Sequence, residues 1–171
     1  VLITGGAGFI GSHLVDHLNK IKKIKKIIIL DNLKDGTKKN LRHSLHSKKI
    51  FLYKKDIRNF EKIYKLFNKV NIVIHLAALS DIVPSIEKPV DYIDTNFNGT
   101  LNILEAMKKY NVKKIIYAAS SSCYGIPKKI PTSEKDIIKP MYPYAFSKYI
   151  GEELIRHYSQ VYKLNYISLR L

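Results

Sequence analysis

The sequence predicts an α/β fold, a Rossmann-like doubly wound parallel sheet, on three observations. Apolar runs of strand length alternate with longer segments of helical periodicity along the 171 residues. The apolar runs are nearly continuous, which indicates strands buried on both faces, as in a parallel sheet. The first run leads directly into a glycine turn and then a helical pattern. We therefore expect one doubly wound domain over residues 1–171, with its ligand at the carboxyl ends of the strands.

The elements follow in order along the chain. Short apolar runs predict strands at Val1–Thr4, Ile27–Asp31, Ile50–Lys54, Ile72–Leu76, Lys114–Ala118 and Tyr166–Leu171. Helical patterns lie at Ile10–Ile21, Phe60–Phe67, Val90–Lys109 and Tyr144–Tyr162, and residues 37–46 form a short helix or a loop. Four prolines favour irregular structure across Ser120–Pro143.

The composition argues against several classes of protein. Cys123 is the only cysteine, which excludes a disulfide framework and a cysteine zinc site and suits the cytoplasm; no metal site is predicted. No run of 18 apolar residues is present, so no membrane span is predicted. The net charge of +16 comes almost entirely from dispersed lysines rather than from arginine, the preferred reader of bases, so nucleic acid is not an expected partner.

Both ends of the chain look cut. Val1 already belongs to the first predicted strand, and Tyr166–Leu171 read as another strand. We therefore expect a fragment that lacks most of a C-terminal substrate-binding region.

The segment Thr4–Gly11 predicts a phosphate-binding turn. Gly6, Gly8 and Gly11 fit G-x-G-x-x-G, while Gly5, Gly8 and Gly11 fit G-x-x-G-x-x-G. Glycine permits the tight turn and lets the backbone approach a pyrophosphate. The start of the following helix offers free N–H groups and a partial positive charge to that anion.

Acidic and small residues end the next strands. Asp31 lies 20 residues after Gly11, the expected place for a carboxylate that hydrogen-bonds the adenosine ribose, although an Asp that merely ends a strand is the alternative. A carboxylate there repels a 2′-phosphate and favours NAD over NADP, a preference that the nearby lysines oppose. Asp56 is placed to meet the adenine amino group, and Leu76-Ala77-Ala78 leaves room for the dinucleotide.

A second constellation carries the chemistry. Tyr144 and Lys148 lie at i and i+4, on one face near a predicted helix start. A phenol is a poor base at neutral pH, but a neighbouring ammonium and a nicotinamide cation favour the phenolate. Tyr144 then serves as general base and acid. Serine hydroxyls after the fifth strand, beginning at Ser120, can hydrogen-bond the same substrate oxygen.

Taken together, the motifs resemble the extended short-chain dehydrogenase/reductase family, in its NAD-dependent nucleotide-sugar epimerase/dehydratase branch. The matching segments, in order, are Thr4–Leu14, Asp31–Leu33, Asp56-Ile57, His75–Ala78, Asn96–Thr100, the serine run ending in Tyr124-Gly125, and Tyr144 with Lys148. The resemblance implies that NAD contacts side chains and backbone from each strand end, at Gly5, Gly8, Phe9, Ile10, Gly11, Asp31, Asn32, Asp56, Ile57, Leu76, Ala77, Ala78, Asn96, Tyr144 and Lys148.

The resemblance also implies catalytic and substrate-contacting residues. Counting back from Tyr124-Gly125 places the catalytic hydroxyl of the family at Ser120, with Ser121 as its partner and Ser122 beside the substrate. Sugar 4,6-dehydratases carry Asp-Glu directly after that position, so serines there disfavour dehydration. The resemblance is closest to UDP-glucose and UDP-N-acetylglucosamine 4-epimerases.

The implied reaction inverts C4 of a UDP-hexose. Tyr144 takes the proton of the 4-hydroxyl, the C4 hydride passes to NAD, and the 4-keto sugar receives the hydride on its other face. An NAD-dependent dehydratase, decarboxylase or reductase of the same family is the first alternative, and a dinucleotide-sensing module is the second. The family resemblance further implies a homodimer formed through the helices Val90–Lys109 and Tyr144–Tyr162.

Overall fold

The computed structural model describes residues 1–127 and 129–171 and confirms the predicted α/β class. Six parallel strands form one sheet in the order β3-β2-β1-β4-β5-β6. Their bounds are β1 Leu2–Thr4, β2 Ile27–Asp31, β3 Ile50–Lys54, β4 Val73–His75, β5 Lys114–Ala118 and β6 Asn165–Leu169. The chain reverses its direction of winding between β1 and β4, which is where ligands bind in sheets of this kind.

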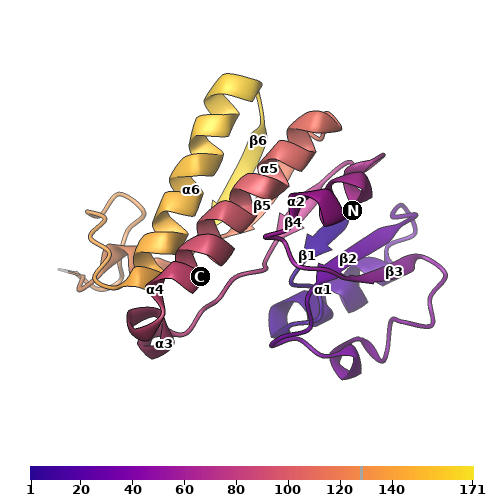
Figure 1. The fold of residues 1–171 in the computed structure, drawn as a ribbon, viewed down its shortest axis with the longest axis horizontal. Helices are drawn as coiled ribbons and strands as arrows, with labels where there is room; N and C mark the ends of the chain where they lie inside the picture. The colour runs from indigo at the N-terminus through magenta and orange to yellow at the C-terminus, as the bar shows by residue number, and fades with distance from the viewer. Residues whose placement is uncertain (128) are drawn as a thin grey trace.

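Helices cover both faces of the sheet (Figure 1). One face packs against α2 (Phe60–Ile63), η2 (Tyr64–Phe67), α5 (Gly99–Lys109) and α6 (Pro143–Tyr162), around a core that includes Leu30, Ile103 and Ile155. The other face packs against α1 (Phe9–Lys20) and the short helix η1 (Lys38–Leu41), around Ile29 and Val15. α5 and α6 lie side by side over the β4–β6 half.

Three local features differ from the prediction. A short helix α3 spans Ile82–Glu87, and it tolerates Pro84 because the N–H that proline lacks would have no acceptor in the first turn. The expected helix Val90–Lys109 is divided into α4 (Pro89–Tyr92), a π-helical segment η3 (Ile93–Asn98) and α5. The segment predicted to be irregular contains the 3-10 turn η4 (Ser121–Tyr124).

The strand ends bring distant segments to one edge of the sheet. Asp31 ends β2, Asp56 follows β3, His75 ends β4 and Ser120 follows β5. Because all six strands are parallel, these residues meet at the same edge as the glycine turn after β1. Within residues 1–127 and 129–171, no helix has the length and apolar character needed to cross a bilayer.

Candidate active site

The glycine turn joins β1 to α1 without room for side chains at two positions. Gly5 has a φ of 67°, and a Cβ there would lie 2.7 Å from the backbone nitrogen of Ala77. A Cβ on Gly11 would collide with the carbonyl oxygen of Gly5. The first turn of α1 leaves the N–H groups of Phe9 and Ile10 without an intrahelical acceptor. The turn is therefore a cradle of backbone donors, the arrangement that binds phosphate.

Asp31 holds this cradle in place. Its carboxylate accepts hydrogen bonds from the backbone N–H of Ala7 (2.9 Å) and of Leu33 (2.8 Å). The residue is only 7% exposed. A carboxylate has about four lone-pair positions, so two acceptors stay available to a ligand. The structure therefore gives Asp31 a second role, in shaping the turn, beside the ribose contact that the sequence predicts.

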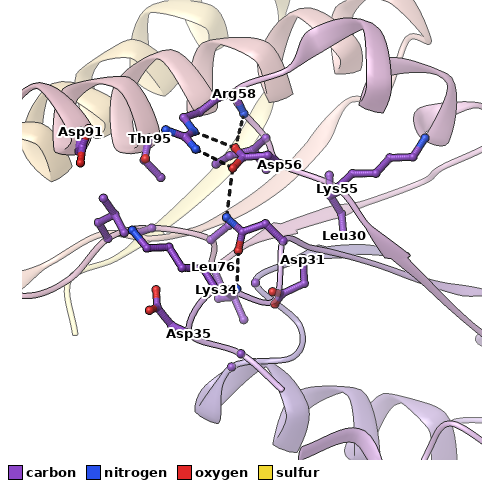
Figure 2. Close-up of a pocket in the computed structure, with 18 residues that line it drawn as sticks. Leu30, Asp31, Lys34, Asp35, Lys55, Asp56, Arg58, Leu76, Asp91 and Thr95 are labelled. Atoms are coloured by element: carbon purple, nitrogen blue, oxygen red, sulfur yellow. Dashed lines mark hydrogen bonds and ion pairs between the residues drawn. The ribbon is translucent and has the colours of Figure 1, made fainter. Parts of the chain in front are cut away.

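The Asp56 carboxylate accepts more hydrogen bonds from the protein than the Asp31 carboxylate does. Oδ1 accepts from the backbone N–H and Nε of Arg58 (2.9 and 3.0 Å), and Oδ2 accepts from Nη2 of Arg58 and Nδ2 of Asn32 (2.9 and 3.1 Å; Figure 2). The hydrogen bonds from Arg58 are the main reason that the pKa of Asp56 falls to about 2. These four donors fill the four lone-pair positions, so an adenine amino group must displace one of them to reach this carboxylate.

These residues line one cleft at the carboxyl edge of the sheet. It holds about 780 Å³ of space between the protein atoms, part of which is open to solvent. Its lining includes most of the predicted cofactor residues: Gly5, Gly8, Asp31, Asn32, Asp56, Ile57, Leu76, Ala77 and Ala78. A neighbouring cavity shares Gly8 and Ala78 and continues along Phe9 to Tyr92, whose ring lies 6.4 Å from that of Tyr144.

Six predicted cofactor residues lie outside this lining, namely Phe9, Ile10, Gly11, Asn96, Tyr144 and Lys148. Phe9 and Ile10 begin α1 with 79% and 53% of their surface exposed, so both side chains can cover a ligand on the turn. Asn96 is buried in η3. Its amide binds both backbone groups of Leu79 (2.8 and 2.9 Å) and donates to Oγ of Ser147 (2.9 Å). Within the described chain, Asn96 therefore ties the cleft wall to α6.

The predicted catalytic hydroxyls meet between β5 and α6. The Tyr144 hydroxyl donates to Oγ of Ser120 at 3.3 Å. Ser120 also accepts from the backbone N–H of Ser122 and contacts Oγ of Ser122 at 2.7 Å. Ser121 lies differently, because its hydroxyl donates to the carbonyl oxygen of Leu171 (2.7 Å). The structure thus pairs Tyr144 with Ser120 and directs Ser121 elsewhere.

Lys148 lies behind this pair, one turn along α6. It is only 4% exposed, and its Nζ lies 4.2 Å from the ring centroid of Tyr117. Burial lowers the pKa of Lys148 to about 7, while the carboxylate of Glu152 acts in the opposite direction. An ammonium with such a pKa exchanges its proton near neutral pH.

A buried polar chain connects the two halves of the site, and sequence reasoning missed its centre, His75. Thr100 donates to the carbonyl of Asn96 (2.6 Å), so its oxygen accepts from Nε2 of His75 (2.9 Å). Nδ1 of His75 then accepts from the Thr4 hydroxyl (2.6 Å), whose oxygen in turn accepts from the backbone N–H of Ala77 (3.1 Å). Burial, and then the charge of Lys148, lower the pKa of His75 to about 3, so it stays neutral.

Comparisons with known proteins identify the family of the chain. A family model described as GDP-mannose 4,6 dehydratase matches residues 2–171. A putative UDP-glucose 4-epimerase from Methanocaldococcus jannaschii is 44% identical over 99% of this chain and 54% of its own length. The chain thus spans about half the length of the curated relatives it matches.

Solved structures of two activities share the fold. The UDP-glucose 4-epimerase of Thermus thermophilus, in complex with NAD, is 35% identical with a TM-score of 0.89 over 99% of this chain and 53% of its own. DesIV, the dTDP-glucose 4,6-dehydratase of Streptomyces venezuelae with NAD bound, is 28% identical with a TM-score of 0.93 over 99% of this chain and 54% of its own. The chain therefore belongs to the GDP-mannose 4,6-dehydratase family, within the extended short-chain dehydrogenase/reductases.

Proposed function

We propose that the protein is a nucleotide-sugar 4-epimerase that inverts C4 of a UDP-linked hexose. The observation that carries this proposal is the hydroxyl pair of Ser120 and Tyr144 at the carboxyl edge of the sheet, with buried Lys148 behind it. The identity to UDP-glucose 4-epimerases supports the same reaction.

The residues of the cleft fit NAD. The backbone cradle at Gly5–Gly11 suits the pyrophosphate, and the two free acceptor positions of Asp31 suit ribose hydroxyls. The Asp31 carboxylate disfavours the 2′-phosphate of NADP. When bound, NAD would supply a reversible hydride acceptor for the sugar carbon.

The chain's own residues would then handle the proton and the orientation. Tyr144 removes the proton of the sugar 4-hydroxyl and returns it when the carbonyl is reduced again. Ser120, 3.3 Å away, donates to the same sugar oxygen and holds it against Tyr144. Lys148, one turn along α6 from Tyr144, supplies a positive charge to this part of the site and exchanges a proton near neutral pH.

The serines after Ser120 favour epimerisation over dehydration. Loss of the C6 hydroxyl needs an acid to protonate the leaving group and a base to remove a second proton. Ser121 and Ser122 supply neither, and Ser121 is hydrogen-bonded to Leu171. A dehydratase, decarboxylase or reductase of the same family is the alternative that the product must exclude.

The substrate and assembly belong to the same proposal. The sugar is UDP-glucose or its N-acetylated counterpart, the protein is cytoplasmic, and two copies associate through α5 and α6. The net charge of +16 attracts a doubly charged nucleotide sugar.

Replacing Tyr144 with Phe tests the proposed acid–base role. In the full-length protein we expect turnover of UDP-glucose or UDP-N-acetylglucosamine to fall by at least about 10²-fold. Bound NAD, measured after denaturation, should be unchanged. Tyr142→Phe is the matched control, because the Tyr142 ring stacks on Tyr144 without joining the hydroxyl pair. Near-normal turnover in Tyr144→Phe would remove Tyr144 from the reaction.

A further inference from the structure

Arg170 lies at the catalytic edge of the sheet, although the proposed reaction gives it no role. It directly follows β6, which pairs with β5 so that Leu169 lies opposite Ala118. Arg170 and Ser120 therefore leave neighbouring strands at the same edge. The Arg170 side chain is 17% exposed and that of Glu152 is 13% exposed, which makes theirs the most buried ion pair in residues 1–127 and 129–171.

The Arg170 guanidinium binds two different segments at once. Nε and Nη2 donate to the two carboxylate oxygens of Glu152 at 3.1 and 3.0 Å. Nη1 donates to the hydroxyl of Tyr124 at 2.6 Å, and the guanidinium carbon lies 5.0 Å from the Tyr124 ring centroid. A two-pronged arginine–carboxylate pair fixes direction as well as distance, which a lysine cannot do.

The Glu152 contact acts on the helix that carries the proposed acid–base pair. Glu152 lies one turn beyond Lys148 on α6, on the same face. Its carboxylate raises the pKa of Lys148 and opposes the effect of burial. The other titratable groups facing Lys148 are His75 of β4, the ring of Tyr117 of β5 and Tyr144 of α6. The Arg170 guanidinium, ion-paired with this carboxylate, offsets part of the negative charge that acts on Lys148.

The Tyr124 contact acts on the turn that follows the proposed catalytic serine. Ser120 caps η4 by accepting from the N–H of Ser122, and Cys123 donates its N–H to the Ser120 carbonyl (3.3 Å). Tyr124 ends this turn before Gly125, whose φ is 66°. Fixing the Tyr124 hydroxyl therefore fixes the rotation of the turn, and with it the direction of the Ser120 hydroxyl.

We propose that Arg170 is a positioning residue that ties α6 to η4 and thereby sets the approach of the Ser120 and Tyr144 hydroxyls. The inference rests on the proposed function, because it concerns the same hydroxyl pair. Arg170 touches neither hydroxyl and acts through Glu152 and Tyr124.

Replacing Arg170 with Met in the full-length protein tests this directly. A misplacement of about 1 Å at reacting groups costs about 10²-fold, so we expect kcat to fall by about 10- to 100-fold with little change in KM or in bound NAD. Arg170→Lys should recover only a small part of the loss, since it keeps the charge without the fork. The control is Arg156→Met, which removes the exposed pair with Glu153 on the same helix and should leave kcat unchanged.

The pKa of Lys148, followed by NMR of its labelled side-chain nitrogen, separates positioning from general support of the fold. In Arg170→Met the Glu152 charge is no longer neutralised, so the pKa of Lys148 should rise. In the double variant Arg170→Met/Glu152→Gln that charge is gone, so the pKa should fall below the wild-type value. The alkaline limb of the pH–rate profile should move in the same two directions. Loss of packing alone predicts no such reversal.

The outcomes are decisive even where one variant fails to fold. If Arg170→Met is unfolded, kcat is measured in Tyr124→Phe instead. This variant removes only the hydroxyl that accepts from Nη1 of Arg170, and we expect it to lower kcat by a few-fold. Glu152→Gln then tests the pKa, because it removes the carboxylate that raises the pKa of Lys148, and that pKa should fall. Wild-type kcat in folded Arg170→Met, or in Tyr124→Phe where Arg170→Met is unfolded, overturns the inference. A Lys148 pKa that changes in neither Arg170→Met nor Glu152→Gln also overturns it. A wild-type protein that yields no 4-epimer overturns the proposed function instead, since the Lys148 titration does not depend on the product.

Discussion

The two halves of the catalytic edge are built in different ways. In the β1–β3 half, the protein's own donors occupy hydrogen-bond acceptor positions of two carboxylates. Asp31 accepts from two backbone N–H groups, and Asp56 accepts from four donors. In the β4–β6 half, the Ser120–Tyr144 bond is long at 3.3 Å, and the buried ammonium of Lys148 faces an aromatic ring. In the β1–β3 half, hydrogen bonds within the protein hold the carboxylates in place. In the β4–β6 half, the hydroxyl pair and the buried ammonium have weaker protein partners, an arrangement that suits ligand binding at a cost in stability.

This difference predicts opposite stability effects for mutations in the two halves. We call the β1–β3 half the cofactor half and the β4–β6 half the catalytic half. Removing a side chain that shapes the glycine turn in the cofactor half should lower the free energy of unfolding. Removing a side chain of the catalytic half should abolish turnover and leave the free energy of unfolding unchanged or higher, as expected where function is built on strained or desolvated groups.

Lys148→Met should give the largest effect and the sharpest contrast. We expect turnover to fall by about 10²–10⁴-fold, because the partner of the acid–base residue is lost. Thermal stability should rise, since a buried ammonium no longer has to be desolvated. The pKa of Lys148 is about 7 in the folded protein, against 10.5 for an ordinary lysine. The unfolded chain therefore takes up the proton first as the pH falls, so the gain in Tm over wild type should be full below pH 7 and vanish above pH 10.5.

Equal stability of Lys148→Met and wild type at pH 6 would contradict this description of the catalytic half. Lys20→Met, at the exposed end of α1, is the control and should change neither turnover nor Tm.

Gly5→Ala tests the opposite behaviour in the cofactor half. The new Cβ meets the Ala77 nitrogen at 2.7 Å in a left-handed backbone conformation, so we expect a loss of about 3 kcal/mol in the free energy of unfolding. Gly8→Ala is the matched control within the same turn: its Cβ meets only the Gly5 carbonyl at 3.3 Å, and its φ is −74°. Urea unfolding of both variants makes the comparison. Similar losses would show that the turn does not depend on the Gly5 conformation.

Asp31→Asn should have an intermediate effect. One of the two backbone N–H groups then faces an amide NH₂, so we expect a loss of about 1–3 kcal/mol. NAD affinity should fall and the preference for NAD over NADP should narrow, as measured by calorimetric titration with each. Full stability with lost NAD binding would mean that Asp31 contacts ligand without shaping the turn.

The Asp56–Arg58 pair should give the smallest effect, because both side chains are partly exposed. The pKa of Asp56 falls from 3.8 to about 2 on folding, so its contribution is present above pH 4 and is lost as the pH falls toward 2. Arg58→Met should lower Tm modestly at neutral pH, and the difference from wild type should disappear near pH 2. If the Tm difference between Arg58→Met and wild type stays constant with pH, the loss of stability comes from packing and not from the ion pair.

The sequence predicts the cofactor half better than the catalytic half, for a physical reason. Strand ends and glycine turns are local, so Gly5, Asp31 and Asp56 could be placed from spacing alone. The chain His75–Thr100–Asn96 joins residues from three separate elements, and no short-range pattern reveals which buried polar groups will meet. Asn96 is the buried residue of the π-helical segment η3, where the sequence pattern predicts a uniform helix.

Isotope labelling tests the central claim most directly. The full-length protein is incubated with UDP-glucose or UDP-N-acetylglucosamine carrying deuterium at C4, and the products are separated and weighed by mass spectrometry. If a hydride is removed and returned at the same carbon, the 4-epimer forms without added NAD and keeps its deuterium at C4. A keto-deoxy sugar that has lost water, or an epimer whose deuterium has exchanged with solvent, would contradict a 4-epimerase built on Ser120, Tyr144 and Lys148.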